Sequence, residues 1–160
     1  HNVLPHYDPG YANVCISIKA LGRPPGDASA SEMERIADLA DRYGMGEIRF
    51  TYSQNVVIPH VRRDQLIRVF EGLGDIGLNG GENGLIGDMI VCPGLDYCNL
   101  ANARSLPLAD RIFQHFADAG LRDEIGKIRL NISGCINACG HHHAADIGIL
   151  GVNKKGVENY

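Results

Sequence analysis

The chain has 160 residues, of which 44% are hydrophobic and 21% are charged, and its formal net charge is −4. This composition is typical of a globular chain of one domain or two small ones, and the acidic balance gives no electrostatic reason to expect nucleic-acid or membrane binding. No apolar run is long enough to cross a bilayer and the start has no signal-peptide layout, so we expect a cytoplasmic protein.

Alternating hydrophobicity predicts a first strand over residues 11–20, with apolar side chains on one face from Val14 to Ile18. A helix is expected to start at Ser31, which forms a capping box with Glu34. Two pairing strands and a second helix then follow over residues 47–52, 55–61 and 63–73. The order β-α-β-β-α predicts an α+β sandwich with its helices on one face of the sheet.

A turn-rich stretch at residues 79–84 is the best candidate boundary, which predicts domains over residues 1–80 and 81–160. In the second domain, Pro107 either breaks a helical stretch or starts its second half. The elements expected there are strands over 88–91, 127–132 and 146–152, a helical stretch over 103–119, and a hairpin turn at 153–156 before a return strand. The abrupt start and end predict a piece of a longer protein, cut short in its second domain.

Four of the five cysteines form two close pairs, Cys92 with Cys98 and Cys135 with Cys139, and each pair directly follows a predicted strand. Four thiolates on two such turns are typical of the ligands of a 4Fe–4S cluster, and the glycines beside them let the backbone approach a bulky group. Three alternatives stay open: a structural zinc site, for which the five-residue spacing is loose, disulfides, and buried free thiols. Cys15 stands alone, as a strand residue with a packing role.

The two cysteine motifs resemble the siroheme and 4Fe–4S signature of the assimilatory nitrite/sulfite reductase hemoprotein family. They read Cys-Pro-Gly-Leu-Asp-Tyr-Cys over residues 92–98 and Ser-Gly-Cys-Ile-Asn-Ala-Cys-Gly over 133–140. Residues 37–40, 43–44 and 48–56 resemble the ferredoxin-like half domain of the same family. That family has two pseudo-symmetric halves, and this chain resembles the second, C-terminal half, because only that half carries the cysteines. Ser53, at a position where the first half has arginine, agrees with this assignment.

The resemblance implies a ferredoxin-like half domain followed by part of an α/β iron–sulfur and siroheme-binding domain. It implies Cys92, Cys98, Cys135 and Cys139 as cluster ligands, with Cys139 bridging a cluster iron and the siroheme iron. Asn137 either contacts the cofactor or sulfur or stabilises its turn, and Arg129 either faces the cofactor or is exposed to solvent. The run His141-His142-His143 is expected to pack near the siroheme or contact its carboxylates rather than bind a metal.

The implied activity is the six-electron reduction of sulfite to sulfide or of nitrite to ammonia, with electrons from ferredoxin or a flavoprotein. The residues that bind the small anionic substrate belong to the missing N-terminal half, so the fragment alone is expected to be inactive. The alternative function is a non-catalytic electron-transfer or zinc-stabilised module that uses the same four cysteines.

Overall fold

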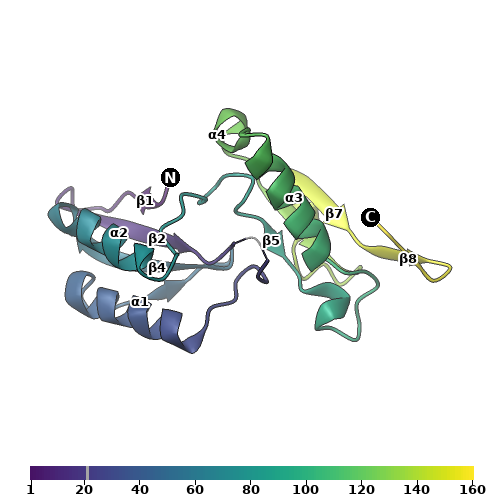
Figure 1. Ribbon diagram of the computed structural model, residues 1–160, viewed down its shortest axis with the longest axis horizontal. Coiled ribbons are helices and arrows are strands. Elements are labelled where there is room, and N and C mark those ends of the chain that lie inside the picture. Colours follow the sequence, from purple (N-terminus) through teal and green to yellow (C-terminus); the bar gives the residue numbers. More distant parts are fainter. Residues whose placement is uncertain (21) are drawn as a thin grey trace. The chain divides into compact units, whose positions relative to one another are not determined.

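The computed structural model describes residues 1–20 and 22–160. The described residues form two compact units, His1–Ile18 with Gly26–Asn83 and Lys19–Pro25 with Gly84–Tyr160. In Figure 1 most of the first unit is coloured from purple to teal, and most of the second from teal to yellow. Among the helices described, none has the length and apolarity needed to span a bilayer.

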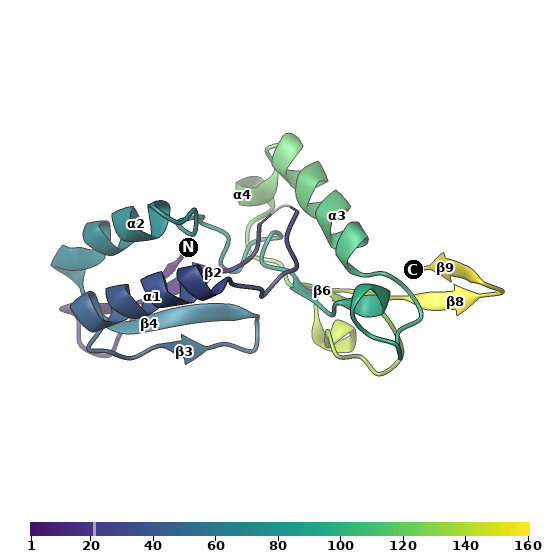
Figure 2. The same ribbon diagram turned by 60° about the horizontal axis from the view of Figure 1, so that its bottom comes forward.

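The first unit is an antiparallel sheet with two helices on one face. Its strand order is β1-β2-β4-β3, and every neighbouring pair is antiparallel. The helices α1 and α2 run side by side over the sheet in Figures 1 and 2. The elements are β1 (Val3–Leu4), β2 (Tyr11–Ser17), α1 (Ala30–Tyr43), β3 (Arg49–Phe50), β4 (Asn55–Arg62), the 3-10 turn η1 (Arg63–Gln65) and α2 (Leu66–Gly74). The predicted order β-α-β-β-α is confirmed, with β1 as an additional edge strand.

The core of this unit forms where the predicted apolar face of β2 meets the helices. Val14, Ile16 and Ile18 belong to one buried cluster with residues of β4, α1 and α2. Ile16 is fully buried, as are Ile36 of α1 and Val69 of α2. Because alternate residues of a strand point to the same face, the period-2 pattern alone is enough to place these side chains in the core.

The start of α1 corrects the prediction by two residues. The N-cap is Ser29, not Ser31, and the reciprocal partner of the capping box is Glu32, not Glu34. The Glu32 carboxylate accepts the Ser29 backbone N–H at 2.7 Å, and the Glu32 N–H donates back to Ser29 Oγ at 3.3 Å. Both serines precede a glutamate by three residues, so the motif fits either start. A start at Ser29 makes the helix about half a turn longer than a start at Ser31.

The second unit contains a three-stranded parallel sheet in the order β5-β6-β7. The crossover from β5 to β6 carries two helices, and α3 lies along the sheet in Figure 2. The elements are β5 (Ile90–Val91), η2 (Gly94–Asp96), α3 (Leu106–Asp118), α4 (Arg122–Ile125), β6 (Leu130–Ser133), η3 (His142–Ala144), β7 (Ile147–Leu150), β8 (Val152–Lys154) and β9 (Val157–Asn159). Pro107 occupies the first turn of α3, where its missing N–H costs no helical bond, so it starts the helix rather than breaking it.

A short segment, Lys19–Pro25, joins the second unit although it directly follows β2. The ammonium group of Lys19 forms an ion pair with Asp88, and both side chains are almost completely buried. The Gly22 N–H donates to Asp110 Oδ1 at 3.2 Å. The chain therefore passes from the first unit to the second before Lys19 and returns to the first after Pro25. The single domain boundary expected between residues 80 and 81 does not include this segment.

Candidate functional site

The cysteine pairs lie on two loops that leave the same edge of the parallel sheet. We call residues 92–104 the first cysteine loop and residues 134–141 the second cysteine loop. Val91 of β5 pairs with Ile132 of β6, and the next residue, Cys92, donates its N–H to the Ile132 carbonyl at 3.0 Å. Because β5 and β6 are parallel, their carboxyl ends meet at one edge, and both loops begin there.

The two loops contact each other backbone to backbone at Gly134. The N–H groups of Asn102 and Ala103 both donate to the Gly134 carbonyl, at 2.8 and 3.0 Å. A Cβ built on Gly94 would lie 2.5 Å from the Ala103 carbonyl oxygen, and φ at Gly94 is +64°. No side chain larger than hydrogen fits this position without moving the backbone. The contact therefore fixes the relative position of the two cysteine pairs.

The first cysteine loop holds its two thiols at different depths. The 3-10 turn η2 reverses the chain after Pro93, and the Cys98 N–H donates to the Gly94 carbonyl at 2.9 Å. Cys92 is buried and Cys98 is half-buried. The turn thus brings the backbone of Cys98 back beside Gly94, two residues after Cys92.

The second cysteine loop consists of two consecutive turns that expose Cys139. Ala138 N–H donates to the Cys135 carbonyl at 3.1 Å, and His141 N–H donates to the Ala138 carbonyl at 2.7 Å. Both Ala138 and His141 have left-handed backbones, with φ of 58° and 52°. Cys135 is buried, whereas Cys139, between the left-handed residues, is exposed. Of the four thiols it is the one most accessible to a second group.

The donor set fits an iron–sulfur cluster. All five cysteines are free thiols, and four of them lie on two loops tied together at their bases. Two buried polar atoms beside these loops, Ser105 Oγ and His142 Nδ1, have no hydrogen-bond partner in the described part of the chain. Among the described residues, no group of three or more metal-ligating side chains is placed to hold one metal ion. In a cluster each thiolate binds a different iron, so convergence on one point is not required.

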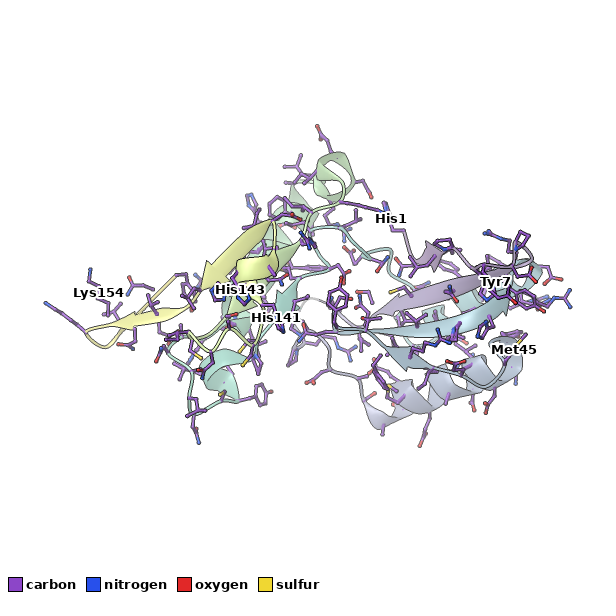
Figure 3. All side chains as sticks on the ribbon, turned by 180° about the vertical axis from the view of Figure 1, so that it is seen from behind. His1, Tyr7, Met45, His141, His143 and Lys154 are labelled. Carbon is purple, nitrogen blue, oxygen red and sulfur yellow. The ribbon has the colours of Figure 1, made fainter. Side chains whose placement is uncertain are left out.

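The other residues that were predicted to contact the cofactors lie in or next to the second cysteine loop and β6. Asn137 is exposed, and its side chain makes no hydrogen bond with the described residues. Arg129 precedes β6, and its guanidinium donates to both Asp146 carboxylate oxygens, at 3.1 and 3.2 Å. This hydrogen bonding lowers the pKa of the Asp146 carboxyl below its usual value. His141 and His143 lie next to each other in Figure 3, with ring centroids 6.1 Å apart.

One structural support was missed from the sequence: the β8–β9 hairpin is bonded to the end of the first cysteine loop. Arg104 N–H donates to Glu158 Oε2 at 2.7 Å, and the Tyr160 hydroxyl donates to the Arg104 carbonyl at 2.7 Å. Burial is the main cause that raises the pKa of the Tyr160 hydroxyl, and its contact with Glu158 adds to it. The partners are more than 50 residues apart, and no local motif in the sequence marks them.

Two family models match consecutive parts of the chain. The nitrite/sulfite reductase ferredoxin-like half domain matches residues 11–76, and the nitrite and sulphite reductase 4Fe-4S domain matches residues 85–160. The chain belongs to the nitrite and sulfite reductase family. Members of this family carry siroheme and a 4Fe–4S cluster, so the match agrees with the thiol chemistry of the two loops and does not favour a zinc module.

Relatives in this family include plant and bacterial enzymes. The chain is 32% identical over 146 residues to a chloroplastic ferredoxin–nitrite reductase of Zea mays, covering 88% of the chain and 25% of the relative. It is 33% identical over 140 residues to a ferredoxin–nitrite reductase of Synechococcus elongatus, covering 88% and 27%. It is 31% identical over 140 residues to sulfite reductase (ferredoxin) 2 of Mycolicibacterium paratuberculosis, covering 84% and 25%. The chain therefore spans about a quarter of the length of these relatives.

Solved structures show the same fold. The Mycobacterium tuberculosis NirA protein matches with a TM-score of 0.75 and 26% identity, over 99% of this chain and 29% of that one. The dissimilatory sulfite reductase DsrI matches with a TM-score of 0.62 and 17% identity, over 89% of this chain and 32% of that one, which shows the fold alone. The predicted α+β class with a ferredoxin-like half domain is confirmed.

Proposed function

We propose that this chain is the cofactor-carrying half of a siroheme- and 4Fe–4S-dependent oxidoreductase. The whole protein would reduce sulfite to sulfide or nitrite to ammonia, a six-electron reaction in both cases. The observation that carries the proposal is the pair of cysteine loops, which leave adjacent parallel strands and share the Gly134 contact within a matched 4Fe-4S domain.

The depths of the thiols suggest a division of roles. Cys92 and Cys135 are buried at the strand ends, so they are suited to hold the inner side of a cluster away from water. Cys139 is exposed, so its thiolate is suited to be shared between a cluster iron and the siroheme iron. When bound, the two cofactors would supply storage and delivery of electrons, and a shared thiolate would give those electrons a covalent path.

The unpartnered atoms beside the loops suggest further contacts. The buried Nδ1 of His142 follows the second loop and is suited to hydrogen-bond a bound cofactor. The exposed amide of Asn137, between two of the proposed ligands, is suited to the same role. Arg129 would contact a cofactor carboxylate only after its hydrogen bonds to Asp146 are broken.

The rest of the reaction would be supplied by other parts of the protein and by a donor. An anionic substrate needs cationic groups to neutralise it, and we assign these to the half of the enzyme that this chain does not include. The donor would be ferredoxin, as the names of several relatives state for those proteins, or a flavoprotein. We propose a cytoplasmic location, because free thiols persist in reducing compartments.

The test uses the full-length protein, purified without oxygen, with single serine replacements at the four proposed ligands. Iron, acid-labile sulfide, zinc, siroheme and visible absorption are measured for each variant. Cys92→Ser, Cys98→Ser and Cys135→Ser should lower iron and sulfide together. Cys139→Ser should in addition remove the spectroscopic coupling between siroheme and cluster.

Cys15→Ser is the matched control. Cys15 is buried in the first unit and donates its Sγ–H to Asn83 Oδ1 at 3.2 Å, a bond that a serine hydroxyl also makes. This variant should keep the cofactor content and the activity of the parent protein. Equal damage from Cys15→Ser and Cys139→Ser would contradict the assigned roles. A colourless parent protein that binds one zinc ion would contradict the function.

A further inference from the structure

Only two asparagines of the chain are followed by glycine, Asn79 and Asn83. This dipeptide is chemically unstable, because the backbone nitrogen of the second residue can attack the side-chain amide of the first, and glycine has no side chain to hinder the approach. Both sites lie in the connection between α2 and β5. Their local chemistry is the same, but the fold gives them different surroundings.

The bond between Asn79 and Gly80 lies in a stretch that is neither helix nor strand. Both residues are exposed, and nothing lies within 4 Å of a Cβ built on Gly80. Within the part of the chain that the structure describes, the Gly80 N–H and the Asn79 side chain make no hydrogen bond. No bond therefore holds the attacking nitrogen away from the carbon that it attacks.

The equivalent groups of Asn83 and Gly84 are held by hydrogen bonds. The Gly84 N–H donates to Asp88 Oδ2 at 2.9 Å, so the nitrogen that would attack is already engaged. The Asn83 amide donates to the His1 carbonyl at 3.2 Å and accepts the Cys15 thiol hydrogen at 3.2 Å. Both residues are half-buried. Attack at this site requires these bonds to break first, so it should be much slower.

We propose that Asn79 is a site of spontaneous deamidation and that the fold protects Asn83 from the same reaction. The Gly80 nitrogen gives up its proton to water and bonds to Asn79 Cγ, and the bond from Cγ to Nδ2 breaks. Nδ2 takes up a proton and leaves as ammonia, which closes a succinimide ring. Water then adds to one ring carbonyl and opens the ring, which leaves aspartate or isoaspartate. The reaction needs no oxidant, reductant or enzyme, so the modified fraction rises with the age of the protein.

Isoaspartate at residue 79 would disturb a contact of the segment that leads into β1. The Asn2 amide donates to the carbonyl oxygens of Gly80 and Cys15, both at 2.9 Å. In isoaspartate the main chain runs through Cβ and Cγ, so the chain becomes one carbon longer before Gly80. The Gly80 carbonyl is then displaced, and Asn2 loses one of these acceptors.

Both products place a new negative charge beside the C-terminal end of α2. A Cβ built on Gly74, the last residue of α2, would lie 2.9 Å from Asn79 Nδ2. The carbonyl end of a helix carries a partial negative charge, and the acidic residue Asp75 directly follows. A carboxylate in place of the Asn79 amide is unfavourable there, so the modified protein should be less stable than the newly made protein.

The experiment incubates the full-length protein, with its cofactors bound, at mildly alkaline pH and follows both sites by peptide mass spectrometry. A protease that cleaves after Glu71 and Glu82 places the two asparagines on separate peptides. The Asn79 peptide should gain the mass difference between OH and NH2 and should contain isoaspartate, while the Asn83 peptide stays unchanged. In denaturant both sites should convert at similar rates, because the hydrogen bonds around Asn83 are lost.

Gly80→Ala is the matched variant, because a Cβ at this position meets no other atom within 4 Å and the fold should not change. It should lower conversion at Asn79 to the level of Asn83. Equal conversion at the two sites in the folded protein, or an unmodified Asn79, would overturn the proposal. Asn79→Asp should melt at a lower temperature than Asn79→Ser, and equal melting temperatures would contradict the proposed effect of the new charge on α2.

Discussion

Gly134 lies directly against Gly94, so close that a Cβ on Gly134 would be 2.8 Å from the Gly94 Cα. The same Cβ would be 2.9 Å from the Ala103 carbonyl oxygen. Both obstacles are backbone atoms, which cannot move out of the way as a flexible side chain does. The spacing of the two cysteine pairs thus depends on two residues that have no side chain.

Gly134→Ala is therefore expected to push the two cysteine loops apart. The free energy of unfolding should fall by about 1–3 kcal/mol, the usual cost of forcing extra atoms into a packed region. Iron content per chain should fall with it, because the four thiols lose their spacing. Thermal unfolding and iron analysis check both. Gly81→Ala is the control, since nothing lies within 4 Å of a Cβ at Gly81, and iron loss in both variants would refute the argument.

The capping box of α1 makes a prediction that separates two adjacent serines. Ser29→Ala should lower the free energy of unfolding by about 1 kcal/mol, because it leaves the Glu32 N–H without its side-chain acceptor. Ser31→Ala should change it much less, since Ser31 lies inside the helix. Chemical denaturation of the two variants gives the comparison. A larger loss of stability in Ser31→Ala than in Ser29→Ala would instead support the helix start at Ser31 that was expected from the sequence.

The ion pair of Arg129 with Asp146 predicts a stability change in acid. Its hydrogen bonds lower the pKa of Asp146 from the ordinary value of 3.8, so the carboxylate stabilises the folded state above that pH. This stabilisation is lost as the pH falls through the lowered pKa. Asp146→Asn should thus be less stable than the parent at neutral pH, by a small amount for so exposed a pair, and the difference should vanish in strong acid. Melting temperatures over a pH series test this, and a difference that grows in acid would contradict it.

The bonds between the hairpin and the first cysteine loop predict a change in protease sensitivity. Glu158→Ala removes the acceptor of the Arg104 N–H and should lower stability by about 1 kcal/mol. Freed from the loop, the hairpin should open more often, so trypsin should cut faster at Lys154 and Lys155. Glu124→Ala, in the exposed helix α4, is the control and should leave the cleavage rate unchanged.

Local patterns in the sequence predicted the parts of the fold that depend on local contacts. The alternation from Val14 to Ile18 identified the buried face of β2. The hairpin before Val157 exists, but its turn is only residues 155–156, because Asn153 and Lys154 belong to β8, a strand separate from β7. The start of α1 was misplaced because Ser29 and Ser31 both satisfy the same motif, and only the folded structure selects between them. The strands that precede the cysteines are shorter than expected because they begin later, β5 at Ile90 rather than at residue 88 and β6 at Leu130 rather than at residue 127.

Contacts between residues that are far apart in the chain could not be predicted from the sequence. The cysteine spacing predicted two loops, and the neighbouring glycines indicated close turns, but nothing showed that Gly94 and Gly134 touch each other. The bond from Arg104 to Glu158 and the bond from Asn2 to Gly80 depend on tertiary folding. The roles of the four cysteines, Asn137 and Arg129 stay predictions until the variants are measured.

The two cysteine loops start from adjacent parallel strands. The distance between the cysteine pairs in space therefore does not depend on the number of residues between them in the sequence. The distance between their starting points is the spacing of β5 and β6, about 4.8 Å, whatever the number of residues in the crossover. The crossover helices α3 and α4 can therefore gain or lose turns in evolution while the thiols keep their positions. Conversely, inserting one residue between Ser133 and Cys135 would shift a ligand directly. In this family, distance in the sequence between the cysteine pairs should vary far more than the spacing within each pair.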